Sequence, residues 1–295
     1  MKKYDFTFTS QGAAPYPKPI RALVVSPDAP DASTGAMLFC HGWGCNRFQH
    51  QDKMEVAAEQ YNLVCVAPEY RMSGYDYDPL GGAGFFQPYD LSFRQTFDAL
   101  QSLRMVLETN PALDRTRIFA YGASQGGHIV MLGSIFAPGL FASVMAGSST
   151  CHVPEEDEHL FNLAGRTFAP WELALRDVIG QAERLPERLF LEHGTADPTV
   201  PHLLHTVRLE KRLRELGRDP YVRYYEGGGH SLAPTTTRLD TFREMAALTL
   251  ATDRLAAPDP FSAGTKVELD YGERRLLIDW SRPVGDNDLY QIVKP

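Results

Sequence analysis

The chain has 295 residues and a formal net charge of −8. This length is enough for a large α/β domain whose core needs no disulfide or metal. Because there is no run of Lys or Arg, nucleic acid and anionic membrane surfaces are not expected as partners. The four cysteines fit neither a zinc spacing nor a Cys-x-x-Cys pair, and no apolar stretch follows the basic first residues. We therefore expect buried thiols, no structural metal, no signal peptide and a cytoplasmic location.

Strand and helix patterns alternate along the first half of the chain. Strand patterns occupy 4–9, 20–25, 36–40, 63–67, 118–121 and 141–146, and helical patterns occupy 51–61, 90–109 and 127–137. Asp90 is the expected N-cap of the second helix. The uncharged stretch 129–147 is interrupted by Pro138 and Gly139, so we interpret it as a buried helix, a turn and a buried strand, not as a membrane span. The long loop 69–89 is of a kind that usually serves function.

In the second half of the chain, the segment 150–186 interrupts the alternation of strand and helix patterns, which then continues. Segment 150–186 carries an acidic run at 155–158 and a helix expected from Trp171 to about Glu183. We interpret it as an insertion over the site, with a solvated connector as the alternative. Alternation then resumes with strands at 189–193 and 221–225 and helices at 203–216 and 235–250. The sequence thus predicts an α/β domain over 1–257, with a mostly parallel twisted sheet and helices on both faces.

The last residues have a different pattern. After Pro258, the stretches 266–271 and 274–280 alternate around a turn at Gly272, which predicts a β-hairpin-like tail. We expect the extension 258–295 to pack on the core or to form a homo-oligomer contact.

A serine motif follows the strand pattern at 118–121. Gly122-Ala123-Ser124-Gln125-Gly126 has the form Gly-x-Ser-x-Gly, with a helix pattern directly after it. A serine on a sharp strand-to-helix turn has a strained backbone, and the residues two positions away must be small to let the chain double back. Ser124 is therefore the candidate nucleophile, at a helix N-terminus whose N–H groups can stabilise negative charge.

A serine nucleophile needs a base and an orienting carboxylate. Asp197 lies in the turn after the strand 189–193, and His230 follows a run of glycines after the strand 221–225. The order Ser124, Asp197, His230 is typical of strand–turn–helix serine hydrolases. An Asp-Pro turn residue is the structural alternative for Asp197.

Backbone donors are expected to form an oxyanion hole. One is the N–H of Gln125, directly after the nucleophile, and the other is the N–H of Trp43, between two glycines after the strand 36–40. We expect the side chain of His41 to hydrogen-bond locally.

These residues resemble those of the α/β-hydrolases, in the branch shared by prolyl-oligopeptidase catalytic domains, acetyl xylan esterases and dienelactone hydrolases. The resemblance covers roughly 36–250 and is carried by His-Gly-Trp-Gly at 41–44, Tyr-Arg-Met-Ser-Gly at 70–74, the serine motif at 122–127, Gly-Thr-Ala-Asp-Pro-Thr-Val-Pro at 194–201 and Gly-His at 229–230. It implies the same fold and a Ser-His-Asp hydrolase without a cofactor.

Three departures keep the subfamily open. Prolyl oligopeptidases usually carry a large N-terminal propeller, and the 35 residues before Ala36 are too few for one. Dienelactone hydrolases use a cysteine where this chain has Ser124. Gln125 resembles the deacetylase motif more than the Tyr that is common in the peptidases.

The leading hypothesis is a carboxylesterase or deacetylase-like serine hydrolase that cleaves a small or medium ester through an acyl-enzyme. An exopeptidase or aminoacyl-amide hydrolase is the alternative, since the acidic run 155–158 could hold a substrate ammonium. A non-catalytic binding protein of the same fold is the alternative of another class. The expected partner is a small ester or short peptide, and Tyr70, Arg71 and Trp171 are the candidate substrate contacts, with an ion pair as the structural alternative for Arg71.

Overall fold

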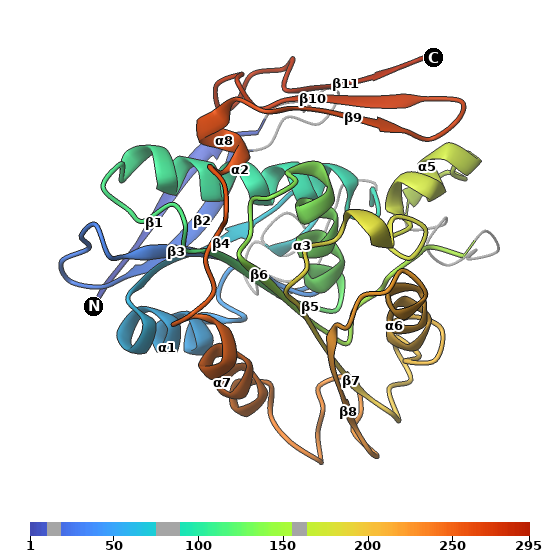
Figure 1. Cartoon of the computed structure of the whole chain (residues 1–295), viewed down its shortest axis with the longest axis horizontal. Helices are drawn as coiled ribbons and strands as arrows, with labels where there is room; N and C mark the ends of the chain where they lie inside the picture. Colours follow the sequence, from blue (N-terminus) through green and yellow to red (C-terminus); the bar gives the residue numbers. More distant parts are fainter. Residues whose placement is uncertain (11–18, 75–88, 155–163) are drawn as a thin grey trace.

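The computed structural model describes residues 1–10, 19–74, 89–154 and 164–295. Its larger sheet has eight strands in the order β1-β2-β4-β3-β5-β6-β7-β8 (Figure 1). These strands are β1 (Lys2–Thr9), β2 (Pro19–Ser26), β3 (Gly35–Cys40), β4 (Leu63–Glu69), β5 (Ile118–Ala123), β6 (Ser143–Gly147), β7 (Leu189–Gly194) and β8 (Tyr221–Tyr225). The pairs β1–β2 and β2–β4 are antiparallel and all the others are parallel, which confirms the predicted mostly parallel sheet.

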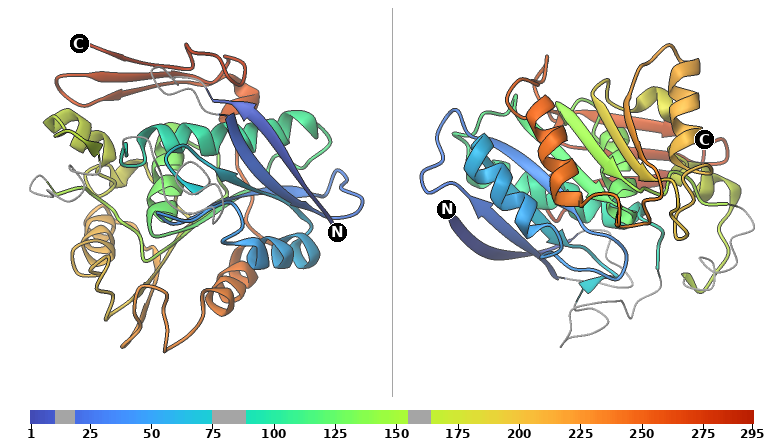
Figure 2. Two further views of the ribbon diagram at one scale, coloured as in Figure 1. Left: turned by 180° about the vertical axis from the view of Figure 1, so that it is seen from behind. Right: turned by 90° about the horizontal axis from the view of Figure 1, so that it is seen from below.

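Helices cover both faces of the sheet. Apolar side chains of α2 (Phe93–Thr109), α3 (Gln125–Phe136) and α6 (Thr206–Glu215) belong to one core cluster, and those of α1 (Gln51–Tyr61) and α7 (Arg238–Thr249) belong to a second one. Figure 2 shows the two layers from behind and from below. The strands between them are apolar on both faces, as expected for parallel strands covered by helices.

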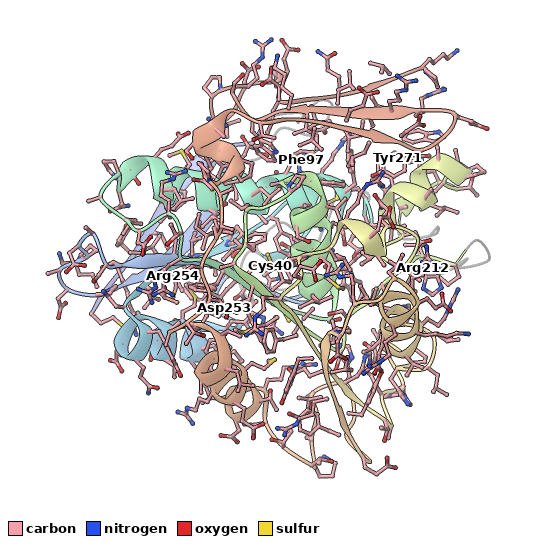
Figure 3. The ribbon with its side chains drawn as sticks, viewed as in Figure 1. Cys40, Phe97, Arg212, Asp253, Arg254 and Tyr271 are labelled. Atoms are coloured by element: carbon pink, nitrogen blue, oxygen red, sulfur yellow. The ribbon has the colours of Figure 1, made fainter. Side chains whose placement is uncertain are left out.

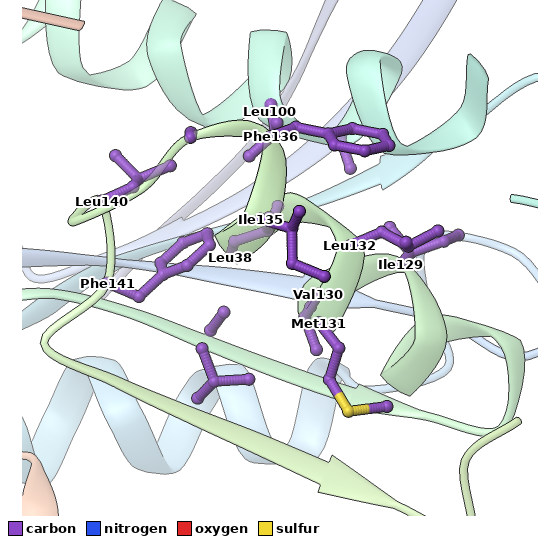
Figure 4. Packing of buried hydrophobic residues seen from close by; sticks show 14 of the residues in the cluster. Leu38, Leu100, Ile129, Val130, Met131, Leu132, Ile135, Phe136, Leu140 and Phe141 are labelled. Atoms are coloured by element: carbon purple, nitrogen blue, oxygen red, sulfur yellow. The ribbon is translucent and has the colours of Figure 1, made fainter. Parts of the chain in front are cut away.

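Helix α3, which follows Ser124, is buried along its whole length. Figure 4 shows its apolar side chains, including Ile129 and Leu132, packed among residues of the sheet and of α2. A Cβ at Gly133 would lie 3.3 Å from Leu100 on α2, so the two helices are in close contact. The segment 129–147 is thus a core helix, a turn and strand β6, as predicted. No helix within the described ranges is long and apolar enough to cross a membrane.

The C-terminal residues form a second, three-stranded antiparallel sheet. It contains β9 (Lys266–Asp270), β10 (Arg275–Asp279) and β11 (Tyr290–Val293), and a short helix α8 (Pro260–Ala263) precedes it. The predicted hairpin is β9–β10, and the sequence analysis missed β11.

This second sheet lies on α2, where Figure 3 labels Phe97. The fully buried Trp280 donates from Nε1 to the carbonyl of Phe136 at 2.9 Å, and the Tyr290 ring stacks on Phe97 at 4.3 Å. The extension therefore closes the outer side of the α2–α3 layer.

Two helix predictions need correction. Helix α2 begins at Phe93 and not at Asp90, because Leu91 and Ser92 have positive φ values of 55° and 76° and Ser92 donates its backbone N–H to the Gln95 side chain at 3.0 Å. The helix expected from Trp171 to Glu183 is the shorter α5 (Pro170–Arg176), followed by a turn and a 3₁₀ segment, Ala182–Arg184. Asp177 ends it by accepting from the N–H of Gly180 at 3.0 Å. The acidic run 155–158 and most of the loop 69–89 lie outside the described residues.

Candidate active site

Ser124 occupies a strained position between β5 and α3. Its φ of 57° and ψ of −124° are rare for a residue with a side chain, and its N–H donates to the carbonyl of Gly147 at 2.8 Å. The residue is partly exposed, whereas its neighbours in the turn are buried. The turn therefore presents the hydroxyl at the N-terminus of a buried helix, as the sequence motif predicts.

The glycines on either side of Ser124 are required by backbone contacts. A Cβ at Gly122 would lie 2.1 Å from the carbonyl oxygen of Gly126, and one at Gly126 would lie 2.0 Å from the carbonyl oxygen of Cys40. Neither distance is compatible with a side chain. The small residues predicted from the sequence are thus explained by the approach of α3 to β3 and β5.

Strained backbone is concentrated around this turn. Apart from Asn62, the described non-glycine residues with positive φ all lie in loops at the carboxyl edge of the parallel strands: Met72, Leu91, Ser92, Ser124, Ser148 and Leu232. Backbone strain of this kind persists only where surrounding structure enforces it, and it clusters at functional sites. Ligands of open α/β sheets also bind at this edge.

Asp197 and His230 are in direct contact at the same edge of the sheet. The His230 Nδ1 donates to Oδ2 of Asp197 at 2.7 Å, from the loop after β8 to the loop after β7. The carboxylate is fully buried, while the imidazole is partly exposed. Arg238 on α7 donates to the backbone carbonyl of His230 and pairs with Glu192 at 3.3 Å, which ties the histidine loop to β7.

Several donors keep Asp197 ionised. Its Oδ1 accepts from the N–H groups of Thr199 and Val200 at 2.9 and 3.0 Å. Burial raises the pKa of the carboxyl, but hydrogen bonds from His193, His230 and Val200 outweigh burial, so the pKa is lowered. Asp197 is therefore a carboxylate across the ordinary pH range.

His193 is a partner of Asp197 that the sequence analysis missed. It lies at the end of β7, is fully buried, and its Nε2 is 3.1 Å from Asp197 Oδ2. The available signal was its position four residues before Asp197 at a strand end, where its side chain can turn back onto the carboxylate.

The three predicted catalytic residues thus follow β5, β7 and β8 and meet at one edge of the sheet, but only Asp197 and His230 touch directly. Within the described residues, Ser124 Oγ forms no hydrogen bond with His230. Hydrogen bonds between a nucleophile and its base often tighten only when substrate binds.

Both predicted oxyanion donors lie beside the serine turn. Gln125 is the first residue of α3, where backbone N–H groups have no acceptor within the helix. Trp43, 46% exposed, follows Gly42, whose Cβ would lie 3.6 Å from the Ser124 Cβ. The Gly42 N–H donates to the Gln49 side chain at 2.6 Å, which fixes the start of this loop.

Tyr70 and Arg71, predicted as substrate contacts, are fully buried and so do not reach a substrate in this structure. Tyr70 supports the loop at 41–44: its hydroxyl donates to the carbonyl of His41, and the two rings stack at 4.0 Å. His41 itself contacts the Gly42 carbonyl at 2.8 Å, in agreement with a local role. Arg71 donates from Nε and Nη2 to Asp98 at 2.8 and 2.7 Å, so the ion-pair alternative is the one the structure supports.

Trp171, the third candidate contact, lines a cavity of about 390 Å³. The cavity lies against the start of α2, helix α5 and β11, and is lined by Met72, Tyr89, Asp90, Phe93, Arg94, Ala164, Gly165, Arg166, Trp171, Glu172, Leu175, Arg176 and Ile292. Its wall is tied to the first turn of α3, because His128 Nε2 donates to the Arg176 carbonyl at 2.8 Å. Burial lowers the pKa of His128 to about 4, so this link is neutral.

No group of three or more His, Cys, Asp or Glu side chains suited to a metal ion occurs among residues 1–10, 19–74, 89–154 and 164–295.

Comparison with known proteins gives relatives of two kinds. The chain is 27% identical over 145 residues to S-formylglutathione hydrolase of Rattus norvegicus, a match that covers 44% of this chain and about half (51%) of the relative. It is 26% identical over 247 residues to the uncharacterized peptidase YtmA of Bacillus subtilis, covering 81% and 90% of the two chains.

Solved structures show the same fold. The acylaminoacyl peptidase of Pyrococcus horikoshii superposes with a TM-score of 0.64 at 16% identity, over 84% of this chain and 40% of that one. The model of the prolyl oligopeptidase family matches residues 89–252, more than half of the chain and including the serine turn, Asp197 and His230. The chain is therefore an α/β-hydrolase and belongs to the prolyl oligopeptidase family.

Proposed function

We propose that this chain is a serine hydrolase that cleaves small or medium esters through an acyl-enzyme on Ser124. The observation that carries the proposal is the strained Ser124 at the start of α3, together with the Asp197–His230 contact of 2.7 Å at the same edge of the sheet. A serine nucleophile, a base and an orienting carboxylate are the three parts that this kind of nucleophilic acyl transfer needs.

In the proposed reaction His230 Nε2 accepts the proton of the Ser124 hydroxyl while Oγ attacks the ester carbonyl. Asp197 stabilises the imidazolium by accepting its Nδ1–H. The tetrahedral intermediate then collapses, the C–O bond to the leaving alcohol breaks, and His230 returns the proton to that alcohol. In the second half His230 deprotonates a water, which attacks the acyl-enzyme carbonyl. The bond to Ser124 Oγ then breaks, the acid leaves, and His230 returns the proton to Oγ.

The developing oxyanion is proposed to bind to the N–H groups of Gln125 and Trp43. The position of Gln125 at the start of α3 adds the favourable end of the helix dipole. The loop that carries Trp43 lies near Ser124, since a Cβ added at Gly42 would lie 3.6 Å from the Ser124 Cβ.

The cavity at Trp171 is proposed to take the variable part of the substrate. It combines the aromatic faces of Trp171 and Phe93 with charged groups on α2 and α5, and its wall joins the first turn of α3 through His128. A small ester or a short peptide is a substrate of suitable size for about 390 Å³.

Labelling with a fluorophosphonate tests the nucleophile. We expect the purified protein to be labelled at Ser124, as located by mass spectrometry of its peptides, and to hydrolyse p-nitrophenyl esters of short acids. The matched control is Ser124→Ala, which should fold and remain unlabelled. A folded wild-type protein that neither labels nor hydrolyses any ester or amide of the panel would instead support the non-catalytic binding protein.

An exopeptidase or aminoacyl-amide hydrolase is the second candidate, favoured by the similarity to a peptidase over 81% of the chain. The ratio of kcat/KM for acyl esters and for aminoacyl p-nitroanilides separates the two. A higher value for the amides, after correction for their lower intrinsic reactivity, would replace the ester proposal.

A further inference from the structure

His193 makes several contacts with the acid loop, which is the loop 195–205 between β7 and α6 that carries Asp197. Its Nε2 lies 3.1 Å from Asp197 Oδ2 and 2.8 Å from the carbonyl oxygen of Val200, and its Nδ1 lies 2.6 Å from Thr206 Oγ1. The side chain is fully buried between β7 and α6, so no water competes for these contacts. One imidazole thus joins three separate parts of the segment from β7 to α6.

The identity of these partners fixes the tautomer. A carboxylate oxygen and a carbonyl oxygen only accept hydrogen bonds, so the proton on Nε2 of His193 points at Asp197 and Val200. The hydroxyl of Thr206 can donate to Nδ1, which lets the neutral imidazole satisfy both of its nitrogens. Thr206 therefore accommodates the Nε2–H form of His193 that Asp197 and Val200 require.

The two imidazoles share one oxygen of Asp197. His230 donates from Nδ1 to Oδ2 at 2.7 Å, and His193 donates to the same Oδ2 at 3.1 Å. A second donor draws negative charge away from the first hydrogen bond, and it also prevents the carboxylate from turning away from His230. The backbone donors at Thr199 and Val200 occupy the other oxygen, so Oδ2 is the atom through which His193 acts on His230.

We infer that His193 is a positioning residue of the active site, which holds the Asp197 carboxylate in the orientation that His230 requires and limits the charge that Asp197 offers to the imidazolium. This inference rests on the function proposed above. It assigns His193 an effect on the pH dependence of the reaction, and not only on the stability of the loop.

Other ionisable groups surround this cluster without contacting the carboxylate. The groups that face it from β7, the segment before α6, β8 and α7 are Glu192, His202, His205, Tyr224 and Arg238. Burial and the neighbouring His152 and His193 lower the pKa of His205 to about 3, so His205 stays neutral at working pH. Burial raises the pKa of Glu192, against the attraction of Arg238. Because burial, the largest cause, is unchanged in the His193 variants, His205 is expected to stay neutral in them.

The test compares the pH profile of kcat/KM for a p-nitrophenyl ester in His193→Leu, His193→Gln and wild type. Leucine removes both contacts of Nε2, so the full charge of Asp197 acts on His230. We expect the acid limb of the profile to move to higher pH by about half a unit and kcat/KM to fall by roughly tenfold or more through the loosened acid loop. Glutamine can still donate one N–H to Asp197 and should give smaller changes in the same directions.

His202→Gln is the matched control. The His202 ring lies 6.2 Å from His193, and the described structure shows no hydrogen bond from it to Asp197. The His202→Gln variant should therefore have the same acid limb of the pH profile as wild type. If His193→Leu does not fold, His193→Gln carries the comparison. A folded His193 variant that loses activity but keeps the wild-type acid limb would overturn the inference, because a purely structural role predicts that pattern.

A second measurement does not depend on turnover. In ¹⁵N-histidine NMR spectra of the full chain, His193 should show a protonated Nε2 and an unprotonated Nδ1 at neutral pH, and Thr206→Val, which removes the hydroxyl at Nδ1, should shift the Nδ1 resonance. Protonation of Nδ1 alone would overturn the inference. A wild-type protein without labelling or hydrolysis would contradict the proposed function instead, and the tautomer would then still report whether His193 donates to Asp197.

Discussion

The serine turn and the acid–base loops are held in place by different interactions. At Ser124 the backbone itself is the constraint, because Gly122 and Gly126 bring β5, α3 and β3 too close for any side chain. At Asp197 the constraint is a set of hydrogen bonds, from two imidazoles and two backbone N–H groups, around one buried carboxylate. The nucleophile is therefore positioned by steric contact, and its base is positioned by polar contacts that ionisation and mutation can alter.

The largest expected effect comes from removing the charge of the Asp197 carboxylate. Asp197→Asn keeps the shape of the side chain, but its amide can donate to His230 Nδ1 and so favour the wrong tautomer of the base. We expect kcat to fall by roughly 10³- to 10⁴-fold with fluorophosphonate labelling slowed in parallel. Stopped-flow or long-term ester hydrolysis measures this, and retention of a tenth of the wild-type rate would contradict the assigned role of Asp197.

The next largest effect is expected at the serine turn, where backbone contacts are the constraint. Gly126→Ala places a Cβ 2.0 Å from the carbonyl of Cys40, so α3 must shift away from β3. We expect the free energy of unfolding to fall by about 3 kcal/mol, measured by urea denaturation. Activity should fall as well, since the shift moves Ser124.

Gly139→Ala is the control for Gly126→Ala. Gly139 has a φ of 76° but no atom within 4 Å of its missing Cβ. It should therefore lose only the conformational cost of a left-handed residue, about 1 kcal/mol. Equal losses in the two variants would show that contact does not constrain the serine turn.

The difference between backbone contacts at Ser124 and hydrogen bonds at Asp197 also explains how much of each region the sequence could predict. The serine turn is local: a strand pattern, two glycines and a helix pattern lie within a few residues, and the sequence analysis places Ser124 correctly between strand and helix. Asp197 and His230 were found through chain order and strand ends, and the structure brings them into contact. His193 was missed because its position four residues before Asp197, at a strand end, allows a contact with the carboxylate but does not by itself give the direction of the side chain.

The errors at other positions also arise from contacts between distant segments. Tyr70 and Arg71 look available in a long loop, but Arg71 is buried by Asp98 on α2 and Tyr70 by the loop at His41. The start of α2 was predicted too early because Asp90 is a good N-cap by residue type, whereas Ser92 is the observed N-cap and the positive φ of Leu91 and Ser92 has no signal in the sequence. Strand β11 is too short for its own sequence pattern to predict it, and it forms a strand by pairing with β10.

A smaller effect is expected in the pH dependence of stability. The pKa of Asp197 is lowered in the folded protein, so its ionised form stabilises the fold at pH above the unfolded value of about 3.9. This contribution is lost as the pH falls toward the folded pKa. The difference in unfolding free energy between wild type and Asp197→Asn should therefore shrink between pH 6 and about pH 2. Denaturation at several pH values measures it, and a difference that grows on acidification would have the wrong sign.

The smallest predicted change is an increase in stability, and it separates strain from chemistry at Ser124. Ser124→Gly removes a side chain from a backbone with a φ of 57°, which glycine adopts without steric cost. Relief of the strain outweighs the added freedom of the unfolded chain, so we expect a gain of about 1 kcal/mol. Ser124→Ala also removes the hydroxyl but keeps the Cβ, and it should be as stable as wild type. Both variants should lack ester hydrolysis, so a stability gain confined to glycine would show that the fold accepts a strained backbone at the position where the nucleophile is needed.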